Sequence, residues 1–230
     1  MDGIKIITTT DGSHTLLNIQ LDEPYHSIHG ALSESLHVFI KNGLDVIVKR
    51  GLPVVRILEI GFGTGLNALL SLRVAQNEKI NIEYTALENN PIDLSLIEKL
   101  NFTQLGELSK YKSNFIRLHE TNWDKPIIVN QFYTLNKWQV GLHEFRSSVK
   151  FDLIYFDAFA PDKQPEMWTS EALALVESLM SPNGMFVTYC AKGEVKRKLR
   201  SVGLTVNSLP GPPGKREMIR AEKIQTQLNV

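Results

Sequence analysis

Apolar residues along this chain follow two different periods. From residue 54 onward, short apolar runs typical of buried strands occur at 54–60, 82–88, 114–119, 151–157, 184–190, 204–209 and 216–221. Between these runs, apolar residues spaced three or four apart predict helices at 66–77, 91–101, 139–147, 169–180 and 193–201. Alternating strands and helices predict an α/β fold with a doubly wound, mostly parallel sheet covered on both faces. Residues 120–138 fit neither period clearly, apart from a strand-like run at 131–135.

The residues before this alternation predict an extension that packs against the core. Residues 4–19 alternate apolar and polar positions around an Asp-Gly pair at 11–12, which predicts a hairpin. An amphipathic helix is predicted at 32–40, with Gly43 as its C-cap. The predicted division is therefore an N-terminal extension, 1–53, and a main domain, 54–230.

Composition narrows the class of protein. The chain has 230 residues, of which 43% are hydrophobic and 22% charged, as in a soluble globular protein. It has no apolar run of the length of a membrane span and no signal-peptide pattern at its start. The single cysteine excludes an internal disulfide and is typical of a reducing, cytoplasmic environment. The oligomeric state is left open.

A glycine-rich turn joins the first strand of the main domain to its first helix. The stretch 56–70 reads RILEIGFGTGLNALL, with glycines at 61, 63 and 65. Such a turn brings backbone N–H groups close to a ligand at the carboxyl edge of a sheet. The spacing G-x-G-x-G differs from the dinucleotide fingerprint G-x-G-x-x-G, and Glu59 would repel a pyrophosphate. The turn thus favours a ligand with positive charge or hydroxyl donors.

Two further carboxylates follow predicted strands at the same edge. Glu88 ends the second strand, where a carboxylate can accept hydrogen bonds from both ribose hydroxyls of a nucleoside. Asp157 ends the fourth core strand and is followed by Phe159 and Pro161, an apolar and rigid loop that excludes water. The alternatives are a solvated glutamate at position 88 and an aspartate that caps the loop at position 157.

Other chemistry has weaker support. The six histidines and Cys190 form no credible metal site, and Cys190 reads as a small buried hydrophobe. From Cys190 onward nine Lys/Arg face three Glu, which gives this tail a charge of +6 and the rest of the chain −6. Basic residues at 192–200 and 214–216 could neutralise the phosphates of a large anionic substrate. The alternative is that these side chains form a solvated helix face.

These motifs resemble the class I S-adenosylmethionine-dependent methyltransferases. More narrowly, EIGFGTGLN (59–67), DAFAPDKQPEMW (157–168), GKREM (214–218) and YHSIHGALSESLHVF (25–39) resemble the methyltransferase domain of the MnmC family. The resemblance implies a Rossmann-like, seven-stranded sheet with an antiparallel last hairpin. It also implies S-adenosylmethionine as cofactor and tRNA as partner. The reaction implied is methylation of the aminomethyl nitrogen of 5-aminomethyl-(2-thio)uridine at the wobble position.

The resemblance implies roles for residues at matching positions of the family motifs. Asp157 is expected to be catalytic. Cofactor contacts are expected from Glu59, Gly61, Phe62, Gly63, Thr64, Gly65, Asn67, Glu88, Asn89, Asp157 and Ala158. Substrate contacts are expected from Tyr25, Ser27, Phe159, Pro161, Lys215 and Arg216. No metal is expected.

The chain also departs from the MnmC pattern. Family members carry a flavin-dependent oxidase domain after this one, and no second glycine fingerprint follows here. We therefore expect the stand-alone form, MnmD, without a fused flavin oxidase domain. Some relatives have an acidic residue at the strand before the catalytic one, where this chain reads LNKWQ (135–139), so the adenine contact is not assigned.

The expected chemistry is a methyl transfer to an amine. An alkylamine with a pKa of roughly 10.4 arrives protonated and must present a neutral lone pair. We expect Asp157 to orient the amine and stabilise the ammonium that forms, because a carboxylate near pKa 4 is a weak base. Rival interpretations are an aminopropyltransferase acting on a polyamine, an NAD-linked oxidoreductase, and a non-catalytic RNA-binding module. The basic tail disfavours the first of these, and the glycine spacing disfavours the second.

Overall fold

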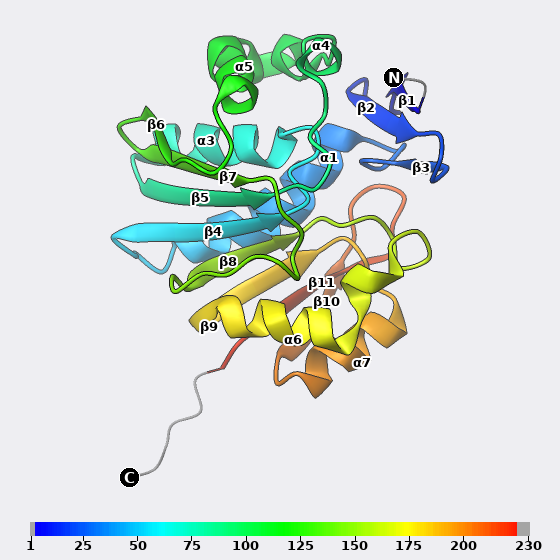
Figure 1. Cartoon of the computed structure of the whole chain (residues 1–230), viewed down its shortest axis with the longest axis vertical. Helices are drawn as coiled ribbons and strands as arrows, with labels where there is room; N and C mark the ends of the chain where they lie inside the picture. Colours follow the sequence, from blue (N-terminus) through cyan, green and yellow to red (C-terminus); the bar gives the residue numbers. More distant parts are fainter. Residues whose placement is uncertain (1–2, 225–230) are drawn as a thin grey trace.

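The computed structural model describes residues 3–224, and two sheets account for its strands. The small sheet contains β1 (Ile4–Thr8), β2 (His14–Asn18) and β3 (Glu23–Pro24). The large sheet contains β4 (Val54–Ile60), β5 (Asn81–Leu87), β6 (Ile127–Asn130), β7 (Tyr133–Trp138), β8 (Phe151–Phe156), β9 (Met180–Thr188), β10 (Thr205–Pro210) and β11 (Glu217–Glu222). Its strand order is β10-β11-β9-β8-β4-β5-β7-β6 (Figure 1).

The pairing directions confirm the predicted doubly wound sheet. Strands β7, β5, β4, β8 and β9 pair in parallel, so their carboxyl ends meet at one edge. Strand β11 is antiparallel to both β9 and β10, which is the expected last hairpin. The sheet has eight strands rather than seven, because β6 pairs antiparallel with β7 and extends that edge.

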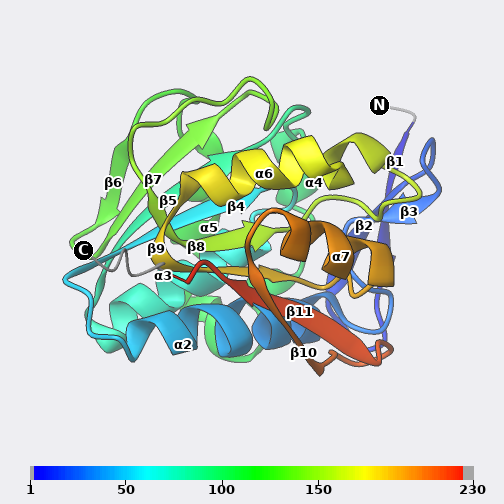
Figure 2. The ribbon, with the colours of Figure 1, turned by 90° about the horizontal axis from the view of Figure 1, so that it is seen from below.

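Helices cover both faces of the large sheet. They are α1 (Ala31–Ser35), the π-helical η1 (Leu36–Leu44), α2 (Asp45–Val48), α3 (Leu66–Glu78), α4 (Leu94–Ile97), the 3-10 segments η2 (Phe102–Gln104) and η3 (Gly106–Tyr111), α5 (Lys112–Glu120), the 3-10 turn η4 (Pro165–Trp168), α6 (Ser170–Leu179) and α7 (Gly193–Ser201). Figure 2 shows α6 and α7 on one side of the sheet and α2 and α3 on the other. No helix within residues 3–224 has the length and apolar character needed to cross a membrane.

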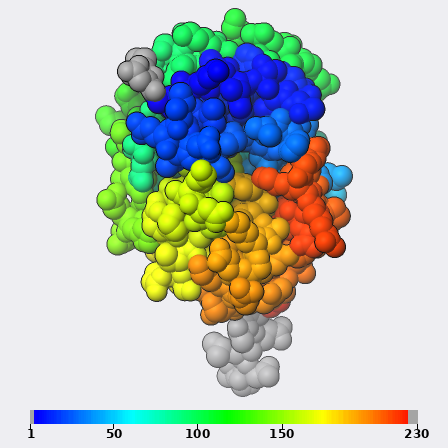
Figure 3. All heavy atoms as spheres, turned by 90° about the vertical axis from the view of Figure 1, so that its right-hand side faces the viewer, coloured from blue at the N-terminus to red at the C-terminus, as the bar shows by residue number. Residues whose placement is uncertain are grey.

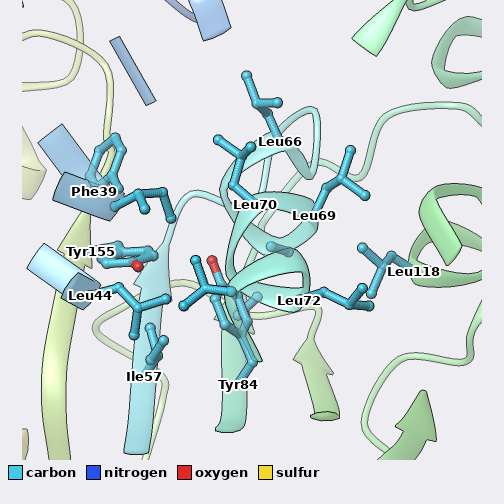
Figure 4. Close-up of a cluster of buried hydrophobic side chains, with 14 of the residues drawn as sticks. Phe39, Leu44, Ile57, Leu66, Leu69, Leu70, Leu72, Tyr84, Leu118 and Tyr155 are labelled. Atoms are coloured by element: carbon cyan, nitrogen blue, oxygen red, sulfur yellow. The ribbon is translucent and has the colours of Figure 1, made fainter. Parts of the chain in front are cut away.

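Each face buries its own hydrophobic cluster. Between the sheet and the α2–α3 side, leucines of α3 pack against Ile57, Tyr84 and Tyr155, with Phe39 of η1 and Leu118 of α5 around them (Figure 4). On the other side, α6 and α7 bury Leu173 and Leu199. Burying an apolar side chain of this size contributes about 1.5–3 kcal/mol, so both clusters stabilise the packing of the helices on the sheet.

The helix predicted at 32–40 is longer than expected. It runs without a break through α1, η1 and α2, from Ala31 to Val48, and Gly43 does not end it. A Cβ atom on Gly43 would lie 3.2 Å from a methyl group of Val187 and 3.4 Å from the ring of Tyr155. This glycine therefore permits close approach to the sheet. The predicted division at residue 53 stays a prediction, since Phe39 and Leu44 belong to the main cluster.

Three other predicted elements are wrong. Residues 114–119 belong to helix α5, because Phe115 and Leu118, three apart, are the positions that it buries. The helix predicted at 91–101 is reduced to the single turn α4, and Asn101 instead hydrogen-bonds the backbone of the β1–β2 hairpin at Gly12 and His14. Residues 139–147 form turns rather than a helix. Of the strand-like run at 131–135, residues 133–135 belong to β7, and residues 131–132 form the turn before it.

Candidate active site

A cavity of about 530 Å³ lies at the carboxyl edge of the large sheet. Its floor comes from the segments that follow four parallel strands, and its roof from the N-terminal hairpin region. The floor segments are 60–64 after β4, 87–91 after β5, 140–142 after β7 and 157–159 after β8. This edge is where ligands bind in open α/β sheets. Predicted residues that line the cavity are Tyr25, Gly61, Phe62, Gly63, Thr64, Glu88, Asn89, Asp157, Ala158 and Phe159.

The glycine turn brings the end of β4 against the loop after β8. Gly61, Gly63 and Gly65 all have positive φ angles, of 91°, 47° and 70°. A Cβ atom on Gly61 would lie 2.7 Å from the backbone oxygen of Asp157. Only glycine fits this position without displacing the backbone. The turn therefore sets the position of Asp157 as well as its own N–H groups.

Glu88 is tied to the same turn. Its Oε2 accepts a hydrogen bond from Gly63 N at 2.9 Å, and its Oε1 accepts one from Asn90 N at 2.9 Å. Burial raises the pKa of Glu88, and these backbone N–H groups oppose that rise. Each carboxylate oxygen keeps a free lone pair, so Glu88 can still accept hydrogen bonds from hydroxyls in the cavity.

Asp157 is held from behind by an amide. Asn67 Nδ2 donates to Asp157 Oδ2 at 2.9 Å and to Glu59 Oε1 at 3.0 Å. Burial, and next the negative charge of Glu34, raise the pKa of Asp157 to about 8, while Asn67 and Lys215 oppose the rise. This value replaces the value near 4 expected from sequence. Asp157 therefore titrates in the range where a general base is effective.

Three predicted cofactor residues lie behind the cavity wall rather than in it. Glu59 is fully buried beneath Asn67, and burial raises its pKa well above the usual range. Asn67 is 2% exposed, and Gly65 packs on the ring of His119. Asn67 contacts Asp157 directly and Glu59 accepts a hydrogen bond from Asn67, which favours a positioning role for both.

The N-terminal extension closes the cavity from above. The ring of Tyr25 lies over Gly63, 3.2 Å from where a Cβ atom would stand, and meets the ring of Phe159 edge-on at 5.0 Å. His26 Nε2 lies 2.7 Å from Thr64 Oγ1, and burial lowers the pKa of His26 to about 4. The neighbouring Ser27 does not line the cavity.

The remaining predicted substrate residues line a second hollow. Pro161, Lys215 and Arg216 surround a space of about 480 Å³ beside the cavity, and Tyr189 lines both spaces. In Figure 3, the N-terminal segment (blue) lies above residues near 160 (yellow-green), 190 (orange) and 215 (red), which meet on one face. The predicted substrate contacts are thus divided between two adjacent spaces.

Comparisons with known proteins agree with this geometry. A family model described as S-adenosyl-L-methionine-dependent methyltransferase matches residues 134–224. The crystal structure of MnmC2 from Aquifex aeolicus superposes with a TM-score of 0.81 at 27% identity, covering 98% of this chain and 72% of that one. By these matches the chain is similar to the S-adenosylmethionine-dependent methyltransferases, and specifically to the MnmC type.

Curated relatives of this methyltransferase are longer proteins. The tRNA 5-methylaminomethyl-2-thiouridine biosynthesis bifunctional protein MnmC of Hydrogenovibrio crunogenus is 32% identical over 171 residues, 70% of this chain and 25% of that protein. The protein of the same name from Pseudoalteromonas atlantica is 28% identical over 239 residues, 95% of this chain and 34% of that protein. The chain thus spans a quarter to a third of the length of these relatives.

The residues of the methyltransferase cavity fit S-adenosylmethionine. Glu88 offers free lone pairs for ribose hydroxyls, and Asp157 is a carboxyl group suited to a cation. Leu87, Val140 and Leu142 supply apolar surface for a base between these groups. The glycine turn leaves room for a close approach of the ligand to the backbone.

Sequence reasoning missed several residues of the methyltransferase cavity. Residues 140–142 follow β7, directly after the region 135–139, which has no assigned adenine contact. Tyr189 follows β9, and its hydroxyl donates to Ala158 O at 2.9 Å. Lys163 Nζ donates to Leu21 O at 2.7 Å and joins the loop after β8 to the extension. Position in the sequence could have identified two of these: residues 140–142 and Tyr189 each follow a parallel strand, at the edge where the other cavity residues lie.

Some basic side chains of the tail are already bound to groups of the protein itself. Lys196 Nζ pairs with Glu217 Oε2 at 2.5 Å, and Lys198 Nζ donates to Trp168 O at 2.9 Å. Two of the cations in 192–200 therefore hold the fold together. Residues 3–224 contain no group of three His, Cys, Asp or Glu side chains arranged to hold a metal ion.

Proposed function

We propose that the chain transfers the methyl group of S-adenosylmethionine to the aminomethyl nitrogen of 5-aminomethyl-(2-thio)uridine at the tRNA wobble position. The names of the MnmC relatives support the substrate class, since they describe tRNA 5-methylaminomethyl-2-thiouridine biosynthesis. The observation that carries the proposal is Asp157, a cavity-lining carboxyl group with a pKa of about 8 beside a nucleoside-sized space. A tRNA substrate implies activity in the cytoplasm.

The donor side of the proposed site is the glycine turn with Glu88. Glu88 would accept hydrogen bonds from the ribose hydroxyls, and the surface of Leu87, Val140 and Leu142 would pack on the adenine. Asn89 and Ala158 complete this side of the cavity. When bound, S-adenosylmethionine supplies an electrophilic methyl group on a positively charged sulfur. Two carboxyl groups in one cavity suit a cation that also carries hydroxyls.

The acceptor side is Asp157 with the aromatic pair Tyr25 and Phe159. Asn67 holds Oδ2, which leaves Oδ1 to accept a hydrogen bond from the substrate nitrogen. An ammonium substrate must first lose a proton, and the ionised Asp157 would be the group that accepts it. The proton taken up by Asp157 would pass to solvent before methyl transfer. The nitrogen–carbon bond would then form as the sulfur–carbon bond breaks, S-adenosylhomocysteine would be the leaving group, and the ionised Asp157 would stabilise the new ammonium.

The proposal is tested by mass spectrometry of nucleosides. The purified chain is incubated with methyl-labelled S-adenosylmethionine and tRNA from cells that lack this methyl group, and the tRNA is then digested. We expect labelled 5-methylaminomethyl-(2-thio)uridine with the wild type and at least 100-fold less with Asp157→Asn, since loss of a general base costs roughly 10²–10⁴-fold. Cofactor binding without any labelled nucleoside would contradict the substrate. Absence of cofactor binding would leave only an RNA-binding module.

A further inference from the structure

More cations than carboxylates line the second hollow. Lys192, Lys215 and Arg216 face it together with one carboxylate, Glu217, so its lining carries two more cations than anions. Glu217 is itself paired with Lys196 at 2.5 Å, outside the hollow. The negative charge in the hollow is thus largely compensated.

Two of the three cations are fixed in place. Lys215 Nζ lies 2.6 Å from Oε2 of the buried Glu34 and 3.7 Å from the centre of the Tyr189 ring. Lys192 Nζ lies 2.5 Å from Oδ1 of Asp162. The exposed Arg216 takes part in none of the ion pairs within residues 3–224. Arg216 therefore supplies unpaired positive charge, and its planar guanidinium matches the geometry of a phosphate.

The hollow is within reach of the methyl-transfer cavity. Tyr189 lines both spaces, and the segment from Asp157 to Pro161 passes from one to the other. Four residues of extended chain span at most about 14 Å, so a group in the hollow lies close to a nucleoside held at Asp157. A nucleotide in RNA carries its charge on the phosphodiesters on either side of it.

We propose that this hollow binds a backbone phosphate adjacent to the methylated nucleotide. The inference rests on the proposed RNA substrate and adds a site at which the protein binds the RNA backbone. Contacts to phosphate position a nucleic acid without reading its sequence. In this arrangement Arg216 and Lys192 bind the phosphate. Lys215 stabilises the wall of the hollow through its ion pair with Glu34, and the modified base enters the cavity at Asp157.

The test combines a protein change with a change in the RNA. The substrate is an anticodon stem-loop with 5-aminomethyl-2-thiouridine at the wobble position, prepared also with a neutral methylphosphonate at each of the two flanking linkages. We expect Arg216→Ala to raise KM about 5- to 10-fold with kcat unchanged, and to lower the slope of log KM against log salt by about 0.7. Arg216→Lys should recover most of the loss. Lys112→Ala removes an exposed cation on α5 that lines neither space, and it should leave KM unchanged.

The decisive measurement combines Arg216→Ala with the methylphosphonate substrate. At one of the two linkages the methylphosphonate should raise KM of the wild type, and its effect on Arg216→Ala should be clearly smaller, since only Lys192 then remains to contact the phosphate. Independent, multiplying effects at both linkages would overturn the inference while methylation itself still supports the proposed function. Failure of the wild type to methylate the unaltered stem-loop would overturn the proposed function, and the phosphate contact with it.

Discussion

Binding of S-adenosylmethionine should release a proton from Asp157. In the ligand-free enzyme burial and the charge of Glu34 raise the pKa of this carboxyl to about 8, so it is mostly protonated at pH 7. A sulfonium ion beside it favours the ionised form and lowers its pKa. Cofactor affinity should therefore rise with pH up to about 8 and level off above it.

The size of this effect follows from Coulomb's law. Two unit charges about 4 Å apart attract by about 4 kcal/mol at an effective dielectric constant of 20, which corresponds to about 3 pKa units. With Asp157 moving from about 8 to about 5, the dissociation constant should increase roughly 50-fold between pH 8 and pH 6. Asp157→Asn, which cannot ionise, should bind with one low affinity across this range.

Isothermal titration calorimetry between pH 6 and pH 9 measures both parts of the prediction. Titrations in buffers of different ionisation enthalpy at pH 7 should show release of nearly one proton per cofactor, and none for Asp157→Asn. S-adenosylhomocysteine is the matched control, because it lacks the methyl group and the positive charge on sulfur. Equal pH dependence for the two ligands, or an unchanged dependence in Asp157→Asn, would refute the electrostatic reasoning.

Two other substitutions separate positioning from binding. Asn67→Ala removes a hydrogen bond that favours ionised Asp157, so the acidic limb of the kcat/KM profile should move to higher pH; a lower rate with an unmoved limb would mean a merely structural role. Glu88→Ala should weaken S-adenosylmethionine and S-adenosylhomocysteine alike, by roughly 10- to 100-fold, since hydrogen bonds to a charged group contribute about 1.5–3 kcal/mol. A loss confined to the charged ligand in calorimetry would contradict a ribose contact.

Much of the fold could be predicted because its signals are local. The run 54–60, the turn at 61–65 and the helix after it are read from adjacent residues, and the structure has them as β4, the turn and α3. The predicted hairpin at 4–19 also depends on its own turn pair, and β1 and β2 confirm it. Carboxylates directly after strands were predicted to meet, and Glu88 and Asp157 do line one cavity.

The errors arise where tertiary contacts override local pattern. Gly43 is typical of a helix end, yet it lies in the middle of a continuous helix. A glycine suits this position because the sheet surface at Val187 leaves little room for a side chain. Residues 114–119 have the apolar content of a strand, and only the helical spacing of Phe115 and Leu118 shows which face they bury. The raised pKa of Asp157 depends first on burial and next on Glu34, which lies more than 120 positions earlier in the sequence.

The two carboxyl groups of the cavity differ because of their neighbours. Glu88 accepts hydrogen bonds from two backbone N–H groups, which stabilise its ionised form against the effect of burial. Asp157 has one amide donor in Asn67 and also faces the negative charge of Glu34. Glu88 is therefore suited to holding hydroxyl groups, whereas Asp157 changes its charge when a cation arrives. Such a group couples arrival of the charged methyl donor to formation of the carboxylate that the acceptor amine requires.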